Sequence, residues 1–318
     1  MMPPKPPCLC KPIPKRLERR VVTIVAGFKS HEGIVLCADT QETVGASKRN
    51  IPKLRFEPSH RADSGVPEDE LAMCFCGAGN NGAFMDEMTD RAWSAACTAT
   101  SLNQACDVIA TSIKQYYREA SDLYQTGYCP ETELVYGVKM QAESRLFYSL
   151  GPAIVEKQTY ATGGQGLYLA DFIASRSYRD VLDLKPCVIL AAYILFEAKE
   201  HIDGCGGQSH IAILRNEETS GCVDSRRIEV MTEFFRDAER KVGDLLLLAA
   251  DLHTGNKVYK SWAVGILDDI CRLRAGKTKE LKQRDEALFL LRRFLNKADE
   301  DEYGLPMPSG SQKSEDQP

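Results

Sequence analysis

The chain has 318 residues, of which 43% are hydrophobic and 27% charged, and its formal net charge at pH 7 is −5. This length and composition allow a substantial core, in one large domain or in one domain with an appendage. The acidic and basic residues are interspersed. Charge therefore gives no argument for a nucleic-acid partner or for an anionic membrane.

The cysteine content and the apolar runs predict a compartment. Most of the 12 cysteines lie in apolar runs such as "LAMCFC", where a thiol behaves as a small core residue, so we expect a reducing environment. The sequence contains no run of eighteen apolar residues, and its first segment lacks the apolar region of a secretory signal. We therefore expect a cytoplasmic protein that does not span a membrane.

Composition divides the chain into four parts. Residues 1–22 are rich in proline and basic residues, which predicts a disordered leader or a reading frame extended too far upstream. Residues 303–318 have the composition of a disordered tail. Between them we expect a layered domain over residues 23–226 and a helical extension over residues 227–302.

The first predicted elements are strands. "VVTIVAGF" and "GIVLCADT" are β-branched apolar runs separated by the polar turn "KSHE", which is typical of a strand pair. "KLRFEP" and "LAMCFCGAG" are two further strand candidates, with a polar loop between them. Four strands are thus expected before any helix.

Helices then arrive in pairs. Apolar residues recur at helical spacing after Asn81 and again after "TATSLN", and three strand-like runs follow, "ELVYGVKMQ", "RLFYSLG" and "AIVEKQTYATG". Two more helices are predicted at about 167–178 and 186–202, before the strand "SHIAILR". Paired helices between groups of strands favour an α+β fold, a four-layer αββα sandwich of two antiparallel sheets, over a βαβ fold. From Arg227 the pattern is helical and ends in "EALFLLRRFLN".

Two kinds of ligand site receive little support. "GAGNNG" at Gly77–Gly82 fits a dinucleotide-binding pattern, but two helices follow it where that fold needs one helix and a return strand, which favours a tight turn. Cys74 and Cys76 share one face of a strand, most simply the core, and His201 and His210 lack metal-ligand spacing. We predict no metal and no cofactor.

One segment carries a family resemblance. "TIVAGFKSHEGIVLCADTQETVG…NIPKLRF" resembles the start of a mature proteasome β-subunit, a member of the N-terminal-nucleophile (Ntn) hydrolases, and also a bacterial group of proteasome-type proteins. The resemblance implies the αββα sandwich, and it implies that Thr23 is the nucleophile, supported by Asp39 and Lys53. Thr43 and Gly45 match the Thr-x-Gly of the family, whereas Lys53 requires a deletion of two residues.

The resemblance continues to about Arg215. "FCGAGNNGAFMDE" resembles the segment whose amide forms the oxyanion hole, here Gly77 or its neighbour Ala78, and "AKEHIDGCGGQSHIAIL" implies an acidic role for Asp203. Two family serines fall on residues without a hydroxyl. These are Gly164, in "YATGGQGLYLADF", and either Gly206 or Cys205.

The implied activity is that of a threonine-type peptidase or amidohydrolase acting on a peptide or amide substrate. The α-amine of Thr23 would serve as the base, with Lys53 lowering the pKa of that amine and Asp39 holding Lys53 in place. Since residue 23 has this amine only as the first residue, we expect the working chain to begin at Thr23. The preceding Val22 is β-branched and disfavours self-cleavage, whereas a GTG start codon at that position would give Met-Thr. The alternative is a catalytically inactive proteasome-like shell or scaffold.

The same resemblance bears on partners. Proteasome subunits assemble in rings, and an apolar stripe between Met231 and Leu245 offers surface beyond the needs of one core, so we expect a homo-oligomer. An ATPase is a possible further partner in this family.

Overall fold

A computed structural model describes residues 23–44, 47–57, 71–123, 130–179 and 182–302. The predicted leader, tail and loop after Glu57 lie outside these ranges, as does Gly45. The described part of the chain divides into a unit that ends at Thr232 and a unit that begins at Glu233. Each unit is described by itself.

The first unit contains a sheet built around the predicted strand pair. Its strands lie in the order β10 (Tyr160–Gly164), β1 (Ile24–Ser30), β2 (Gly33–Asp39), β11 (Ser209–Arg215) and β12 (Gly221–Cys222), all antiparallel to their neighbours. Gly33 opens β2 with φ +146°, and a Cβ there would lie 2.0 Å from Leu214 O. Only glycine therefore fits where β2 meets β11.

The second sheet consists of a meander, in which consecutive strands are neighbours. Its strands are, in spatial order, β5 (Leu54–Glu57), β6 (Leu71–Gly79), β7 (Thr132–Met140), β8 (Glu143–Leu150) and β9 (Ala153–Lys157). A separate two-stranded ribbon joins β3 (Gln41–Val44) to β4 (Ser47–Asn50).

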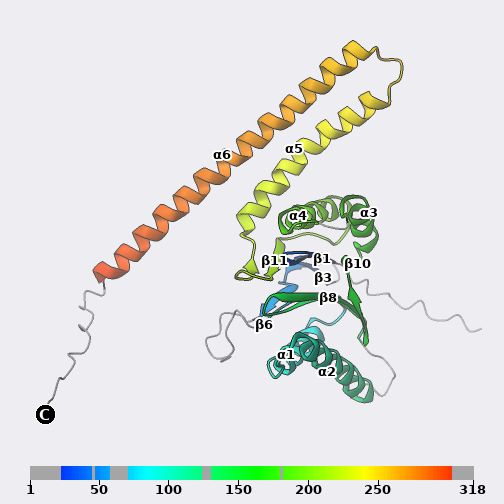
Figure 1. Cartoon of the computed structure of the whole chain (residues 1–318), viewed down its shortest axis with the longest axis vertical. Coiled ribbons are helices and arrows are strands. Elements are labelled where there is room, and N and C mark those ends of the chain that lie inside the picture. The colour runs from blue at the N-terminus through cyan, green and yellow to red at the C-terminus, as the bar shows by residue number, and fades with distance from the viewer. Residues whose placement is uncertain (1–22, 45–46, 58–70, 124–129, 180–181, 303–318) are drawn as a thin grey trace, which may run out of the picture. The chain divides into compact units, whose positions relative to one another are not determined.

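The helices cover the outer faces of the two sheets. Figure 1 shows α1 (Gly82–Ala96) and α2 (Leu102–Leu123) beside the sheet of β6 and β8, and α3 (Leu167–Ser177) and α4 (Leu184–His201) beside the sheet of β1 and β10. Asn81 caps α1 by accepting a hydrogen bond from Phe84 N at 3.1 Å. The prediction of a mixed helix-and-sheet fold with antiparallel sheets is confirmed.

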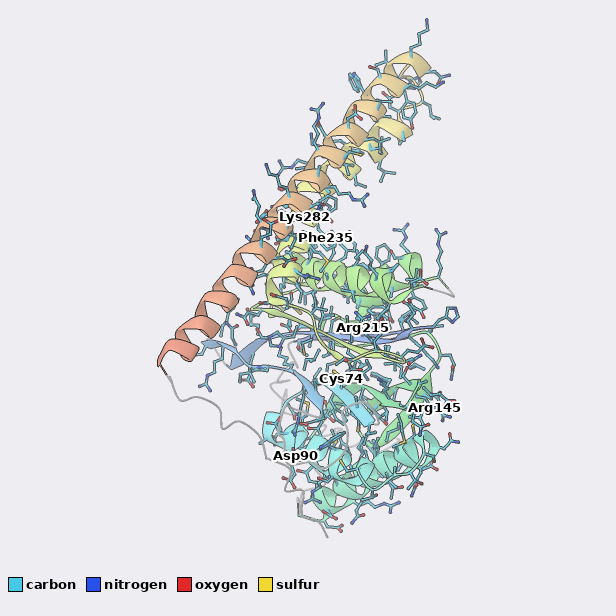
Figure 2. All side chains as sticks on the ribbon, turned by 60° about the vertical axis from the view of Figure 1, so that its left-hand side comes forward. Cys74, Asp90, Arg145, Arg215, Phe235 and Lys282 are labelled. Carbon is cyan, nitrogen blue, oxygen red and sulfur yellow. The ribbon has the colours of Figure 1, made fainter. Side chains whose placement is uncertain are left out.

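Two of the apolar clusters between these layers position the strands. One contains residues of both sheets, such as Val25, Leu36, Val135 and Leu146, and includes Cys74, which Figure 2 labels among the strands. The other lies between α1, α2 and the second sheet. Alternate residues of β6 and β7 enter different cores, as the period of two along a strand requires.

The second unit is a helical hairpin. It contains most of α5 (Ser225–Ala250), which spans the division between the units, and all of α6 (Asn256–Glu302), and Figure 1 shows the two helices side by side. The predicted helical extension is thus two long helices joined by a short turn.

Two features differ from the sequence prediction. "AIVEKQTYATG" is not one strand, because β9 closes the second sheet and β10 crosses to the first, where it pairs with β1. The ribbon of β3 and β4 has no apolar alternation and its sequence gave no sign of a strand pair.

Candidate active site

Thr23 lies immediately before β1, between the flanking strands β2 and β10. Thr23 is 2% exposed to solvent, and its carbonyl oxygen accepts a hydrogen bond from Gly166 N at 3.3 Å. β1 pairs with β10 on one side and with β2 on the other. This pairing fixes the position of the Thr23 backbone, from which the side chain extends.

Asp39, the last residue of β2, lies beside this threonine and is 0% exposed. Its Oδ1 accepts hydrogen bonds from Thr23 Oγ1 at 2.5 Å and from Ile24 N at 3.3 Å, while its Oδ2 accepts one from Gly206 N at 3.0 Å. A buried carboxylate is stable when donors surround it in this way.

Lys53 completes the cluster from the other sheet, immediately before β5. Its Nζ donates to Thr23 Oγ1 at 2.6 Å, to Asp39 Oδ1 at 2.8 Å and to Gln41 O. Burial lowers the pKa of Lys53 below its ordinary value, and the negative charge of Asp39 opposes this shift.

The Thr23 hydroxyl thus has both of its hydrogen-bonding roles occupied. Its oxygen accepts from the Lys53 ammonium and its proton points to the Asp39 carboxylate. A hydroxyl held between a cation and an anion is oriented for reaction with a carbonyl carbon, and the cation stabilises negative charge on that oxygen. The structure brings together Thr23, Asp39 and Lys53, three of the five site residues that the family resemblance implied.

The turn after α4 contacts this cluster through backbone hydrogen bonds. Gln41 N donates to Gly206 O at 3.2 Å, and Lys199 Nζ donates to Gly207 O at 2.7 Å. Cys205 is buried in the same turn, and burial, followed by the charge of Asp39, raises the pKa of its thiol to about 12. That thiol remains protonated at neutral pH and is no competing nucleophile.

Gly77 does not present a free amide in this structure. Its N–H donates to Lys53 O at 3.2 Å, continuing the pairing of β5 with β6. Its neighbour Ala78 lies opposite Glu133 on β7. An oxyanion role for the Gly77 amide thus requires this hydrogen bond to open.

Gly164 occupies a backbone conformation that excludes the serine of the resemblance. Its φ is +83°, and a Cβ there would lie 2.4 Å from Thr23 O. Its N–H donates to Glu133 Oε2 at 2.7 Å. The sequence analysis missed Glu133, although an acid at the start of the otherwise apolar "ELVYGVKM" was a visible signal.

Asp203 does not join the cluster. Its side chain is exposed in the turn between α4 and β11, and no hydrogen bond or ion pair links it to any residue that the structure describes. The side chain of Thr43 lies outside the described residues. Among the residues described, no group of three or more His, Cys, Asp and Glu side chains is placed to hold a metal ion, and none of the helices there is long and apolar enough to cross a membrane.

Comparison with known proteins relates this fold to the Anbu proteins. The fold matches that of Anbu (ancestral beta-subunit) from Yersinia bercovieri, with a TM-score of 0.56, 14% identity, and coverage of 70% of this chain and 97% of that chain. It also matches an Anbu (Gly-1) mutant from Hyphomicrobium sp. strain MC1, with a TM-score of 0.55, 16% identity, and coverage of 70% and 96%.

A third similar structure is the helical assembly of the Anbu complex from Pseudomonas aeruginosa, with a TM-score of 0.56, 14% identity, and coverage of 70% of this chain and 95% of that chain. Identities this low establish a shared fold and no more. No family model and no curated protein matches the sequence.

Proposed function

We propose that this chain is a threonine-type Ntn hydrolase, a peptidase or amidohydrolase with Thr23 as its nucleophile, on the four-layer αββα sandwich of that class. One observation carries the proposal. Thr23 Oγ1 lies 2.6 Å from Lys53 Nζ and 2.5 Å from Asp39 Oδ1, and all three groups are shielded from water, with the Lys53 side chain only 11% exposed.

In this mechanism the oxygen of Thr23 attacks the carbonyl carbon of an amide. Once Thr23 is the first residue, its hydroxyl proton turns from Asp39 to the free α-amine, whose reference pKa of about 7.7–8.0 leaves a useful neutral fraction near pH 7. The Lys53 ammonium lowers the pKa of this amine further, while Asp39 orients Lys53. The α-amine then returns the proton to the leaving nitrogen as the C–N bond breaks, and water hydrolyses the resulting ester.

The mechanism needs Thr23 to be the first residue, since a peptide nitrogen has no basic lone pair. We therefore propose that the working chain begins at Thr23, either by removal of residues 1–22 or by initiation at codon 22 followed by removal of Met. N-terminal sequencing of protein purified from its own host tests this step. An intact Met1 on fully active protein contradicts it.

The nucleophile is tested with an electrophile that reacts with N-terminal threonine. We expect Thr23→Ala to abolish both labelling and hydrolysis. Ser30→Ala is the matched control, because Ser30 lies at the other end of β1, where its hydroxyl donates to Gly33 O at 3.2 Å. Labelling of the Thr23→Ala protein at the level of the parent would disprove the assignment.

A catalytically inactive shell or scaffold remains the second candidate, and three observations favour it. The Gly77 amide is engaged with Lys53 O, Asp203 makes no contact with the cluster, and Gly164 cannot carry a hydroxyl. An inert protein with residues 1–22 still attached would support the scaffold. Label on Thr23 would exclude it.

Assembly is part of the proposal. The Anbu complex from Pseudomonas aeruginosa forms a helical assembly, and we propose that the present chain is likewise a homo-oligomer, in the cytoplasm, with an ATPase as a possible partner. Light scattering that shows a monomer at micromolar concentration would contradict the homo-oligomer.

A further inference from the structure

The two helices of the second unit have a defined antiparallel register. Lys241 Nζ pairs with Asp269 Oδ2 at 2.6 Å, and Lys277 Nζ pairs with Glu233 Oε2 at 2.6 Å. The step from one ion pair to the other is equal and opposite along α5 and α6, so the register is constant. It places Leu246 level with Val264.

A seam of shielded residues runs between the helices at alternating spacings of three and four, as in a coiled coil. On α5 the seam comprises Ala238, Lys241, Leu245 and Leu248. On α6 it comprises Tyr259, Ala263, Ile266, Ile270 and Leu273. Ala238 and Leu248 are buried, and the other seam residues are half-buried. The seam accounts for the pairing of α5 with α6.

Apolar residues also occupy both outer sides of the hairpin near its turn. Residues that follow a seam position share one side of an antiparallel pair, and residues that precede one share the other. Flank A contains the followers Val242, Leu246, Val264 and Leu267. Flank B contains the preceding residues Leu247, Val258 and Trp262. With Leu252 in the turn, these side chains are between 47% and 90% exposed.

This distribution is unusual for a helix in water. An ordinary surface helix has one apolar stripe, whereas a helix that is apolar on all sides is normally buried. The seam already buries the inner stripe, so each flank is a further contact surface. Because the flanks lie on opposite sides, one hairpin has room for two neighbours.

Near the turn, the charges beside the two flanks have opposite signs. Lys260 follows the seam residue Tyr259 and borders flank A, while Asp244 precedes the seam residue Leu245 and borders flank B. No ion pair joins Asp244 or Lys260 to any residue that the structure describes. Flank A therefore complements flank B better than it complements itself.

The side of the hairpin that carries a flank is somewhat smaller than one half of a standard interface. On α5 the paired part runs from Glu233 to Ala250, which is roughly 27 Å at 1.5 Å per residue, and with two helices side by side it gives on the order of 500 Å², of which the apolar flank is the part near the turn. A stable interface of standard size buries about 800 Å² on each partner.

We propose that flank A of one copy packs against flank B of the next copy, with the hairpins parallel and their turns at the same end. This contact goes beyond the proposed hydrolase function and does not depend on it. It joins two different surfaces, so it repeats from copy to copy and builds a closed ring or an open helix. The hairpin thereby contributes its own contact to the assembly.

The test uses sedimentation velocity on the full chain and two double variants. Leu246→Glu with Leu267→Glu blocks flank A, and Leu247→Glu with Trp262→Glu blocks flank B. We expect each blocked protein to lose the wild-type assembly, with at least a roughly 100-fold weaker association, because two large side chains lose their burial in the contact. Ala275→Glu, on the solvent side of α6, is the control and should assemble as the wild type does.

Mixing the two blocked proteins provides the decisive observation. Each retains the surface that the other lacks, so we expect a one-to-one pair of the two blocked species and no longer array through the hairpin. Blocked proteins that assemble like the wild type, or a mixture that forms no pair, would overturn the proposal.

Circular dichroism verifies that the variants keep their helix content, and Leu→Gln changes at the same leucines replace any variant that does not. Vesicles of neutral and of anionic lipid test the other occupant. A monomeric wild type that binds vesicles through these flanks would overturn the proposal in favour of a membrane surface. Threonine labelling of the wild-type chain tests the hydrolase separately. A wild-type chain that assembles as proposed and takes no label would contradict the hydrolase and leave the hairpin contact standing.

Discussion

Replacing Gly164 by serine restores the hydroxyl that the family resemblance implies, and we expect it to harm the protein. The φ of +83° costs a residue with a Cβ about 1–2 kcal/mol. The new Cβ would also lie 2.4 Å from Thr23 O and 3.0 Å from Thr23 Cγ2, so β10 must move away from the start of β1. Together these effects should remove roughly 2–4 kcal/mol of unfolding free energy.

The measurement is urea unfolding together with the rate of threonine labelling. A loss of this size in a domain of 150–250 residues lowers the Tm by roughly 5–15 °C. Labelling should slow as well, since the displaced carbonyl belongs to Thr23, the proposed nucleophile. Gly82→Ser is the control, because nothing lies within 4 Å of a Cβ at that position. A Gly164→Ser protein as stable as the parent, with faster labelling, would refute the reasoning.

Three further predictions concern buried and half-buried groups. Asp39→Asn should abolish labelling and cost about 3–5 kcal/mol, because it leaves the shielded Lys53 ammonium without its anion, and urea unfolding with a labelling assay measures both effects. Glu133→Ala should cost about 1–3 kcal/mol by leaving Gly164 N–H without its acceptor, whereas Glu133→Gln should retain most of the stability, and equal losses in the two variants would contradict this role. Burial raises the pKa of Cys37 from 9.0 to about 12, so above pH 9 the unfolded chain loses this proton and the folded chain keeps it. Stability should then fall with rising pH by about 1 kcal/mol per pH unit for this thiol, and a Cys37→Ala chain with the same pH slope would contradict the assignment.

The sequence predicted the elements that have a clear period or a clear turn. The pair around "KSHE", the strands "LAMCFCGAG" and "ELVYGVKMQ" and the paired helices all appear close to their expected positions. Two adjacent strands that belong to different sheets could not be separated, because "AIVEKQTYATG" has the same composition on both sides of its turn. Which sheet a strand joins is decided by long-range pairing, here of β10 with β1.

The candidate site was predictable in part. Thr23, Asp39 and Lys53 share no sequence pattern that geometry alone would reveal, and the family resemblance identified them. The engagement of the Gly77 amide and the isolation of Asp203 depend on how the β5 edge and the turn after α4 are folded. Sequence spacing carries no information on either point.

Lys53 also connects the two sheets of the first unit. Its carbonyl is held by Gly77 in one sheet, while its ammonium reaches Thr23 and Asp39 at the end of the other sheet. A shift of one sheet over the other by an ångström would lengthen both of those contacts and leave each sheet intact. We therefore expect threonine labelling at Thr23 to depend on the alignment of the two sheets, and to decline under pressure, heat or core substitution before any strand or helix is lost.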